Sequence, residues 1–394
     1  MLLIKNGTIN DAVHEEPYLS DILVSQGKII KIEPNIIPDK ETAVFDAAGK
    51  YIYPGFIDAH SHIGLDGYGI GYEGQDYNEL NDIVTPQLRA IDAIQPMDEA
   101  FLKAVKAGIT SVATGPGSSN VLGGTFTAIK TIGKRIDDMV IRPAIAMKCA
   151  FGENPKRCYR DKFDTTRMST AAKLREMLFK AREYARKIEA AGEDESKRPL
   201  FDIKLEALLP VLRKEIPLKA HAHQANDMFT AIRIAREFGV DITLEHVTEG
   251  HLIVEELAKE NIPLAVGPSF GHPTKFELRN KTWETPGVLA NAGCKVSIIT
   301  DAPVIPQEYL PLCAGLAVKS GMKPFDALRA ITINPARHIG IADRVGSVEI
   351  GKDGDIVITD GNPFELGTTV EAVFIEGKLV SGEMKSFNSH VEYH

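Results

Sequence analysis

The alternation of apolar and polar positions predicts short strands at both ends of the chain. Near the start, the β-rich segments contain Asn6-Gly7 and Gln26-Gly27, which are typical of turns. The same pattern, with glycines between the apolar stretches, returns near the end. The predicted strands lie within residues 2–9, 21–32, 43–46, 346–358 and 372–380. Because each end alone is too small for a stable sheet, we expect residues 1–53 and 341–394 to pair into one small β-sandwich domain.

Between the two ends, strand patterns alternate with helix patterns. Helices are predicted over residues 97–108 and 169–191, and strands over 109–114, 141–150, 218–221, 242–246, 263–266 and 296–301. Repeated β–α units of this size imply a parallel sheet wrapped by helices. Residues 54–340 fit a (β/α)8 TIM-like barrel, which takes roughly 250 residues before insertions. The expected class is therefore α/β.

The composition and net charge of the chain limit the kinds of binding partner that we expect. Of the 394 residues, 44% are apolar and 25% are charged, as in an ordinary globular enzyme. The net charge is −9 and there is no basic block, which argues against nucleic acid or an anionic membrane as the main partner. No apolar run approaches the roughly 20 residues that span a bilayer, and the start lacks the features of a signal peptide. We expect a cytoplasmic protein whose four scattered cysteines are reduced.

One short segment carries the first chemical signal. Residues 51–57 predict a buried strand that leads to His60 and His62. Residues two apart on a strand point to the same face, so both imidazoles face one space. Neutral imidazoles that converge are suited to a divalent metal ion. The alternative is a pair of core histidines bonded to the backbone, and two ligands alone would not hold a catalytic ion.

Further candidate ligands stand at the ends of other predicted strands: His221, His246 and Asp301. In a (β/α)8 barrel the carboxyl ends of the strands meet at one face, where the active site lies. Several imidazoles with a carboxylate favour Zn²⁺, with Fe²⁺ or Mn²⁺ as alternatives, and the set allows one or two ions. Asp301 could instead cap the N-terminus of a helix, a common use of Asp that does not exclude metal binding.

These residues, in this order, resemble the metal-dependent amidohydrolase superfamily, and within it the imidazolonepropionase-like members. The motifs are Pro54-Gly55-Phe56-Ile57-Asp58-Ala59-His60-Ser61-His62, Lys219-Ala220-His221-Ala222-His223, Glu245-His246, Thr300-Asp301, Ile331-Thr332-Ile333-Asn334-Pro335-Ala336-Arg337 and residues 346–357. The resemblance implies that Asp301 binds the metal and also accepts a proton from a water that the metal activates. It implies His221 as the ligand of its strand and His223 as a catalytic or supporting group, although the two could exchange roles.

Other residues have several interpretations. Lys148 stands at a predicted strand end among apolar neighbours. It could be a carbamylated lysine that bridges two metals, although superfamily members usually carry that lysine on a later strand. The alternatives are a cation that contacts a substrate carboxylate and a surface lysine. Glu153, Asn154 and His272, on loops near the strand ends, are candidates for substrate binding.

Four further features are weaker. His251 is another candidate for substrate contact, and Glu206 is more typical of an exposed helical residue than of a ligand. The acidic, glycine-rich loop 66–81 is long enough to cover a site, and loop 115–120 would line its pocket.

Taken together, the sequence predicts a hydrolase that cleaves a non-peptide C–N bond, in a cyclic or small amide, through metal-activated water. A dipeptidase-like or deaminase member is the alternative enzyme. A non-catalytic relative that keeps the barrel for assembly should have lost ligands, and here all are present. The expected partner is a small-molecule substrate. Many barrels of this kind are oligomers, so a homo-oligomer is an expectation from the resemblance.

Overall fold

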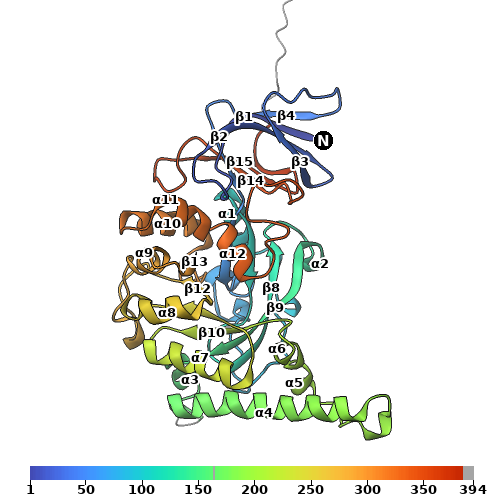
Figure 1. Cartoon of the computed structure of the whole chain (residues 1–394), viewed down its shortest axis with the longest axis vertical. Helices are drawn as coiled ribbons and strands as arrows, with labels where there is room; N and C mark the ends of the chain where they lie inside the picture. The colour runs from blue at the N-terminus through green and yellow to red at the C-terminus, as the bar shows by residue number, and fades with distance from the viewer. Residues whose placement is uncertain (163–164, 385–394) are drawn as a thin grey trace, which may run out of the picture.

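Strands from both ends of the chain form one sheet, which lies at the top of Figure 1. The structure is a computed structural model that describes residues 1–162 and 165–384. The sheet order is β16-β15-β14-β5-β1-β2-β3, and β4 also pairs with β1. The strands are β1 (Leu2–Ile9), β2 (Tyr18–Ser25), β3 (Lys28–Glu33), β4 (Ala43–Asp46), β5 (Tyr51–Pro54), β14 (Ile356–Thr359), β15 (Val370–Ile375) and β16 (Lys378–Gly382). The antiparallel pairing of β14 with β5 joins the two ends, as predicted. Residues 385–394, which we assigned to this domain, lie outside the described residues.

This small sheet has an apolar core of its own. Buried side chains from β1, β2, β5, β14 and β15 make up most of this core. Asn6-Gly7 does not form the predicted turn, because β1 continues through it with a bulge and Asn6 has a φ of 63°. A Cβ on Gly7 would lie 2.3 Å from Ile52 Cδ1, so glycine is required by this close packing. The Gln26-Gly27 turn between β2 and β3 is present.

The second sheet forms a nearly closed barrel of eight strands. Its order is β13-β12-β11-β10-β9-β8-β7-β6, and the edge strands β13 and β6 lie against each other. The strands are β6 (Phe56–Ser61), β7 (Ile109–Thr114), β8 (Leu122–Lys130), β9 (Val140–Ala150), β10 (Leu218–Ala222), β11 (Ile242–His246), β12 (Pro263–Val266) and β13 (Lys295–Ile298). The predicted TIM-like barrel in an α/β fold is therefore present.

One strand departs from the predicted (β/α)8 pattern. β8 runs antiparallel to both β7 and β9, whereas the other neighbouring pairs are parallel. A short loop, not a helix, connects β7 to β8, and this is sufficient because antiparallel neighbours need no crossover. The expectation of uniform β–α units is wrong at this point. With β8 included, β9 is the fourth strand counted from β6.

Helices surround the barrel in Figure 1, and the long α4 lies at the end remote from the small sheet. They are α1 (Glu99–Lys106), α2 (Ile136–Met139), α3 (Glu153–Cys158), α4 (Arg167–Ala191), α5 (Ile203–Glu206), α6 (Leu209–Leu212), α7 (Ala225–Phe238), α8 (Val254–Glu260), α9 (Thr285–Asn291), α10 (Leu310–Lys319), α11 (Pro324–Ala330) and α12 (Ile333–His338). A capping box at Thr166 begins α4, and Gly239 in the left-handed conformation ends α7. Across residues 1–162 and 165–384, we find no helix with the length and apolar character needed to cross a bilayer.

The chain passes from one sheet to the other at Gly55. The single strand predicted over residues 51–57 is in fact two, β5 in the small sheet and β6 in the barrel. The Gly55 N–H donates to the Asp355 carbonyl (2.9 Å), and a Cβ here would lie 2.0 Å from Thr110 Oγ1. Because this crossing point is fixed, His60 near the end of β6 and His62 directly after it lie at the carboxyl end of the barrel.

Candidate metal centre

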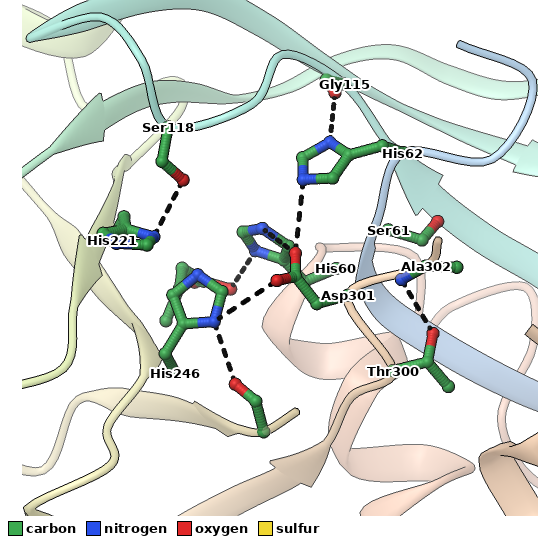
Figure 2. Close-up of polar contacts among 12 residues, drawn as sticks. His60, Ser61, His62, Gly115, Ser118, His221, His246, Thr300, Asp301 and Ala302 are labelled. Atoms are coloured by element: carbon green, nitrogen blue, oxygen red, sulfur yellow. Dashed lines mark hydrogen bonds and ion pairs between the residues drawn. The ribbon is translucent and has the colours of Figure 1, made fainter. Parts of the chain in front are cut away.

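Two groups of potential ligands lie at the carboxyl ends of the barrel strands. One consists of His60, His62 and Asp301, and the other of His221, His223 and His246; within each group the ligand atoms lie within 4.8 Å of one another. Asp301 lies between the groups, with Oδ1 3.2 Å from His62 Nε2 and Oδ2 4.0 Å from His246 Nδ1 (Figure 2). The structure thus brings together five histidines from β6, β10 and β11 and one aspartate that follows β13. Their role as metal ligands stays a prediction.

Most of these imidazoles are held through Nδ1. His62 donates from Nδ1 to the Gly115 carbonyl (2.7 Å), as Figure 2 shows. His246 donates from Nδ1 to the Gly267 carbonyl (2.9 Å). A carbonyl oxygen can only accept, so Nδ1 carries a proton in each of these two rings. His221 Nδ1 lies 2.8 Å from Ser118 Oγ. Such outer partners orient the ligating nitrogens of histidine in metal sites.

The residues fit a divalent ion. His221 Nε2 and His246 Nε2 are buried and have no hydrogen-bond partner in the part of the chain that the structure describes. Burial lowers the pKa of His246 to about 4, and it lowers the pKa of His221 well below its usual value. Both rings are therefore neutral, and each has a buried nitrogen lone pair without a partner. Buried polar atoms in proteins are normally satisfied, and an ion is one means of doing so.

Asp301 carries the negative charge of the centre. It follows β13 by three residues and has a φ of 54°, while its N–H donates to the His60 carbonyl (3.2 Å). Burial alone would raise the pKa of Asp301, but the polar N–H groups of the neighbouring His246 and His62 rings outweigh burial and lower it. The strand end is held by Asp58, whose carboxylate accepts hydrogen bonds from the N–H and hydroxyl of Thr300.

Lys148 lies inside the barrel. Its Nζ is 3.1 Å from His60 Nε2 and its side chain is fully buried, which excludes the interpretation as a surface lysine. Burial lowers the pKa of Lys148 to about 8. The sequence placed Lys148 on too early a strand, because the antiparallel β8 was not predicted. In the structure it stands on β9, the fourth strand, which pairs directly with the strand of His221.

A buried carboxylate beneath the centre was not predicted. Glu245 Oε2 accepts from Lys219 Nζ (2.7 Å) and lies 2.8 Å from His60 Nδ1, while Oε1 lies 2.9 Å from His338 Nε2. Burial opposes ionisation of Glu245, but the Lys219 ammonium and His338 outweigh it and hold its pKa well below the usual value. The sequence contained one signal of this group of charges. Lys219 lies two residues before His221 on the same strand, so the two side chains point to the same face of the sheet.

A second unpredicted carboxylate approaches His221 and His223. Glu277 belongs to the 3-10 helix η6 (Phe276–Leu278) and is fully buried. Its Oε1 lies 3.7 Å from Nε2 of both His221 and His223. Its Oε2 accepts from the Glu153 N–H (2.9 Å), and Lys275 Nζ donates to Asn154 Oδ1 (3.0 Å). No pattern around Glu277 distinguishes it from an ordinary acidic residue.

Of the three predicted substrate-binding residues, two lie beside the histidines and one lies on an exposed loop. Glu153 and Asn154 begin α3 and contact the segment that carries Glu277, beside the histidines. His272 is exposed on the loop after β12. The roles of these three residues in substrate binding stay predictions. From loop 66–81, Tyr77 stacks on the ring of His62 at 5.2 Å between centroids.

Two weaker candidates make contacts of their own. His251 bonds to Thr285 and Glu206 accepts from Tyr184. The four cysteines form no disulfide bond within the described residues.

The chain is similar in sequence and fold to known amidohydrolases. An amidohydrolase crystal structure from Thermotoga maritima MSB8 is 41% identical, with a TM-score of 0.94 over 97% of this chain and all of its own. Imidazolonepropionase of Symbiobacterium thermophilum is 25% identical over 91% of this chain and 89% of its own length.

Other relatives are longer than this chain. Amidohydrolase tasK of Hapsidospora irregularis is 29% identical and adenine deaminase 1 of Latilactobacillus sakei is 23% identical. The alignments cover 91% and 99% of this chain but only 40% and 58% of those relatives. The profile of the amidohydrolase family matches residues 51–380, which include the whole barrel and all the candidate ligands. This chain therefore belongs to the amidohydrolase family, whose members are metal-dependent.

Proposed function

We propose that the protein is a metal-dependent hydrolase that cleaves the C–N bond of a cyclic or small amide. The observation that carries the proposal is the convergence of His60, His62, His221, His246 and Asp301 at one end of the barrel. Two of these residues present buried nitrogen atoms that have no hydrogen-bond partner among residues 1–162 and 165–384. Family membership supports hydrolytic chemistry, whereas the substrate is a matter of the surrounding loops.

The ligand groups suggest two positions for divalent ions. His60, His62 and Asp301 would hold one ion, and His221 with His246 would hold the other. Zn²⁺ suits this mixture of nitrogen and oxygen donors, with Fe²⁺ or Mn²⁺ as alternatives. When bound, such ions lower the pKa of water and polarise a carbonyl group.

The side chains would move the protons. Asp301 is ionised, and its carboxylate lies next to both ligand groups, so it can accept a proton from the attacking water and deliver it to the departing nitrogen. His223 Nδ1 lies 2.7 Å from Thr248 Oγ1, which orients its Nε2 as a second polar group of the site. Tyr77, stacked on His62, would limit the access of bulk water.

Lys148 is our candidate for a bridging group between the ions. As a neutral amine it could add carbon dioxide and release a proton to give a carbamate, which would present two oxygens where Nζ now faces His60. Burial lowers the pKa of Lys148 to about 8, so a larger share of the side chain is neutral amine than in an ordinary lysine. Intact mass under non-denaturing conditions should show the mass of one added carbon dioxide, and metal uptake by apoprotein should increase with bicarbonate. An unmodified lysine, with uptake indifferent to bicarbonate, would exclude the carbamate.

The first test of the function is metal content per chain in protein purified without chelator. We expect one or two equivalents of zinc, iron or manganese, and fewer in the Asp301→Asn and His62→Asn variants. The absence of any ion, before and after reconstitution, would refute the proposal.

A loaded enzyme would then be offered lactams, N-acyl amino acids and dipeptides. Aminopurines belong in the same screen, because the similarity to adenine deaminase 1 covers nearly the whole chain.

Three further proposals concern the whole molecule. We propose that residues 1–53 and 341–394 form one domain, with the small sheet folded as a β-sandwich, and that residues 54–340 form the hydrolase domain. The separate apolar core of the small sheet supports this division. A homo-oligomer and a cytoplasmic location complete the proposal; native mass and cell fractionation test them.

A further inference from the structure

The carboxylate of Glu277 faces His221 and His223 at the carboxyl end of the barrel. The Oε1 atom of Glu277 lies 3.7 Å from the Nε2 atoms of both histidines. We propose that His223 and Glu277 are ligands of a divalent ion together with His221. The second ion of the centre would then be held by His221, His223, Glu277 and His246. This inference rests on the proposed metal-dependent function and adds two ligands to it.

The spacing of the three atoms suits a metal ion. Zinc binds imidazole nitrogens and carboxylate oxygens at about 2.0–2.2 Å, so two ligands in a tetrahedral site lie about 3.3–3.6 Å apart. The two separations of 3.7 Å that involve Glu277 Oε1 need only a small contraction to reach this range. The same distance is too long for a hydrogen bond, so the carboxylate does not pair directly with either ring.

The three side chains are also held from behind. His221 Nδ1 lies 2.8 Å from Ser118 Oγ, and His223 Nδ1 lies 2.7 Å from Thr248 Oγ1. Glu277 accepts the Glu153 N–H at Oε2, which leaves Oε1 directed at the histidines. Each ligand therefore has one atom fixed by the protein and one atom turned toward the shared space, which is how outer partners prepare metal ligands.

Two buried atoms in this space, His221 Nε2 and Glu277 Oε1, accept no hydrogen bond of good geometry from the described residues. An unpaired carboxylate oxygen in a buried site is costly, so a positive charge is expected beside it. Lys275 supplies one, because its Nζ lies 2.5 Å from Glu277 Oε1. Its side chain is 15% exposed and also contacts Asn154, so it can retain that partner when an ion takes its place.

We therefore infer that the Lys275 ammonium occupies the cation position in the metal-free chain and competes with the ion. The two substitutions that each remove one partner of this ion pair should therefore change the metal affinity in opposite directions. Removal of the carboxylate should weaken binding of the ion, whereas removal of the ammonium should strengthen it. If Lys275 and Glu277 were only a structural pair, both substitutions would weaken the site.

The experiment is a titration of chelator-treated protein with Co²⁺, followed by visible absorption and by metal content after gel filtration. Wild-type protein should bind two equivalents. The Glu277→Gln and His223→Asn variants should bind the second equivalent at least about 10-fold more weakly, since even loss of an outer partner costs 10–100-fold. Their visible spectra should lose the contribution of the second ion. Lys275→Met should bind the second equivalent more tightly than wild type, and Lys281→Met on the same segment should not differ from wild type.

Controls separate this inference from the proposed function. Asp301→Asn should weaken the first equivalent, and circular dichroism should show that every variant is folded. If Glu277→Gln and His223→Asn bind both ions like wild type, or if Lys275→Met weakens binding, the inference is wrong while the function stands. The inference is also wrong, and the function again stands, if wild-type protein binds one ion that is lost in Asp301→Asn and unchanged in Glu277→Gln. A wild-type protein that binds no ion refutes both.

Discussion

Glu245→Gln tests whether the buried carboxylate orients a metal ligand or only stabilises the barrel. Glu245 is fully buried and interacts with Lys219, His60 and His338, in each case at 2.7–2.9 Å. Glutamine keeps the shape of the side chain but removes its charge. One of the two carboxylate oxygens is replaced by an NH2 group, a donor that would face the donors of the neighbouring residues. The substitution leaves the Lys219 ammonium buried without an anion.

We expect the substitution to lower both the stability of the protein and its affinity for metal. Loss of one partner of a buried ion pair costs about 3–5 kcal/mol of unfolding free energy. Independently, His60 loses the carboxylate that orients its ring, and loss of such an outer partner costs about 10–100-fold in metal affinity. Stability is measured as the urea midpoint from circular dichroism and from the fluorescence of Trp283, the single tryptophan. Metal affinity is measured by competition with a chelator.

A double substitution distinguishes the two effects. In Lys219→Met with Glu245→Leu both charges are absent, so part of the lost stability should return, because apolar replacement of a buried pair is often neutral. Metal affinity should stay low, because His60 still lacks its partner. If Glu245→Gln lowers stability but binds metal as tightly as wild type, the carboxylate does not orient the ligand and our reasoning is wrong.

Three other predictions can be tested with the same preparations. Asp301→Asn should keep the fold but lose turnover by at least about 100-fold, as expected for a residue that transfers protons; near-normal rates would exclude that role. Gly115→Ala should lower the unfolding free energy by about 1–3 kcal/mol and weaken metal binding, because the added Cβ would lie 2.4 Å from Phe126 and shift the carbonyl that holds His62; an unchanged urea midpoint would contradict this. Burial lowers the pKa of His338 below its usual 6.5, so unfolding takes up a proton below that pH and the metal-free protein should lose stability as pH falls from about 7 to about 5; a constant midpoint across this range would count against a neutral buried ring.

The sequence by itself determined the class of fold and most of the candidate ligands that the structure brings together. Hydrophobic periodicity is a local property, so it showed the β–α alternation and the strands at both ends. The histidines and Asp301 were visible because each stands at the end of an apolar strand, and barrel geometry sends all such ends to one face. The His-x-His spacing indicated that both rings face one space, because side chains along a strand alternate between its faces with a period of two.

Only the tertiary structure decided the remaining features. The direction of β8 depends on which strands it joins, and no local pattern distinguishes an antiparallel strand from a parallel one when both of its faces are buried. This single strand changed the position of Lys148 in the barrel. Glu245 and Glu277 were missed because their partners are distant in sequence, and a lone acidic residue becomes significant only when folding buries it beside a lysine or an imidazole. The backbone carbonyls that orient the histidines leave no trace in residue identity at all.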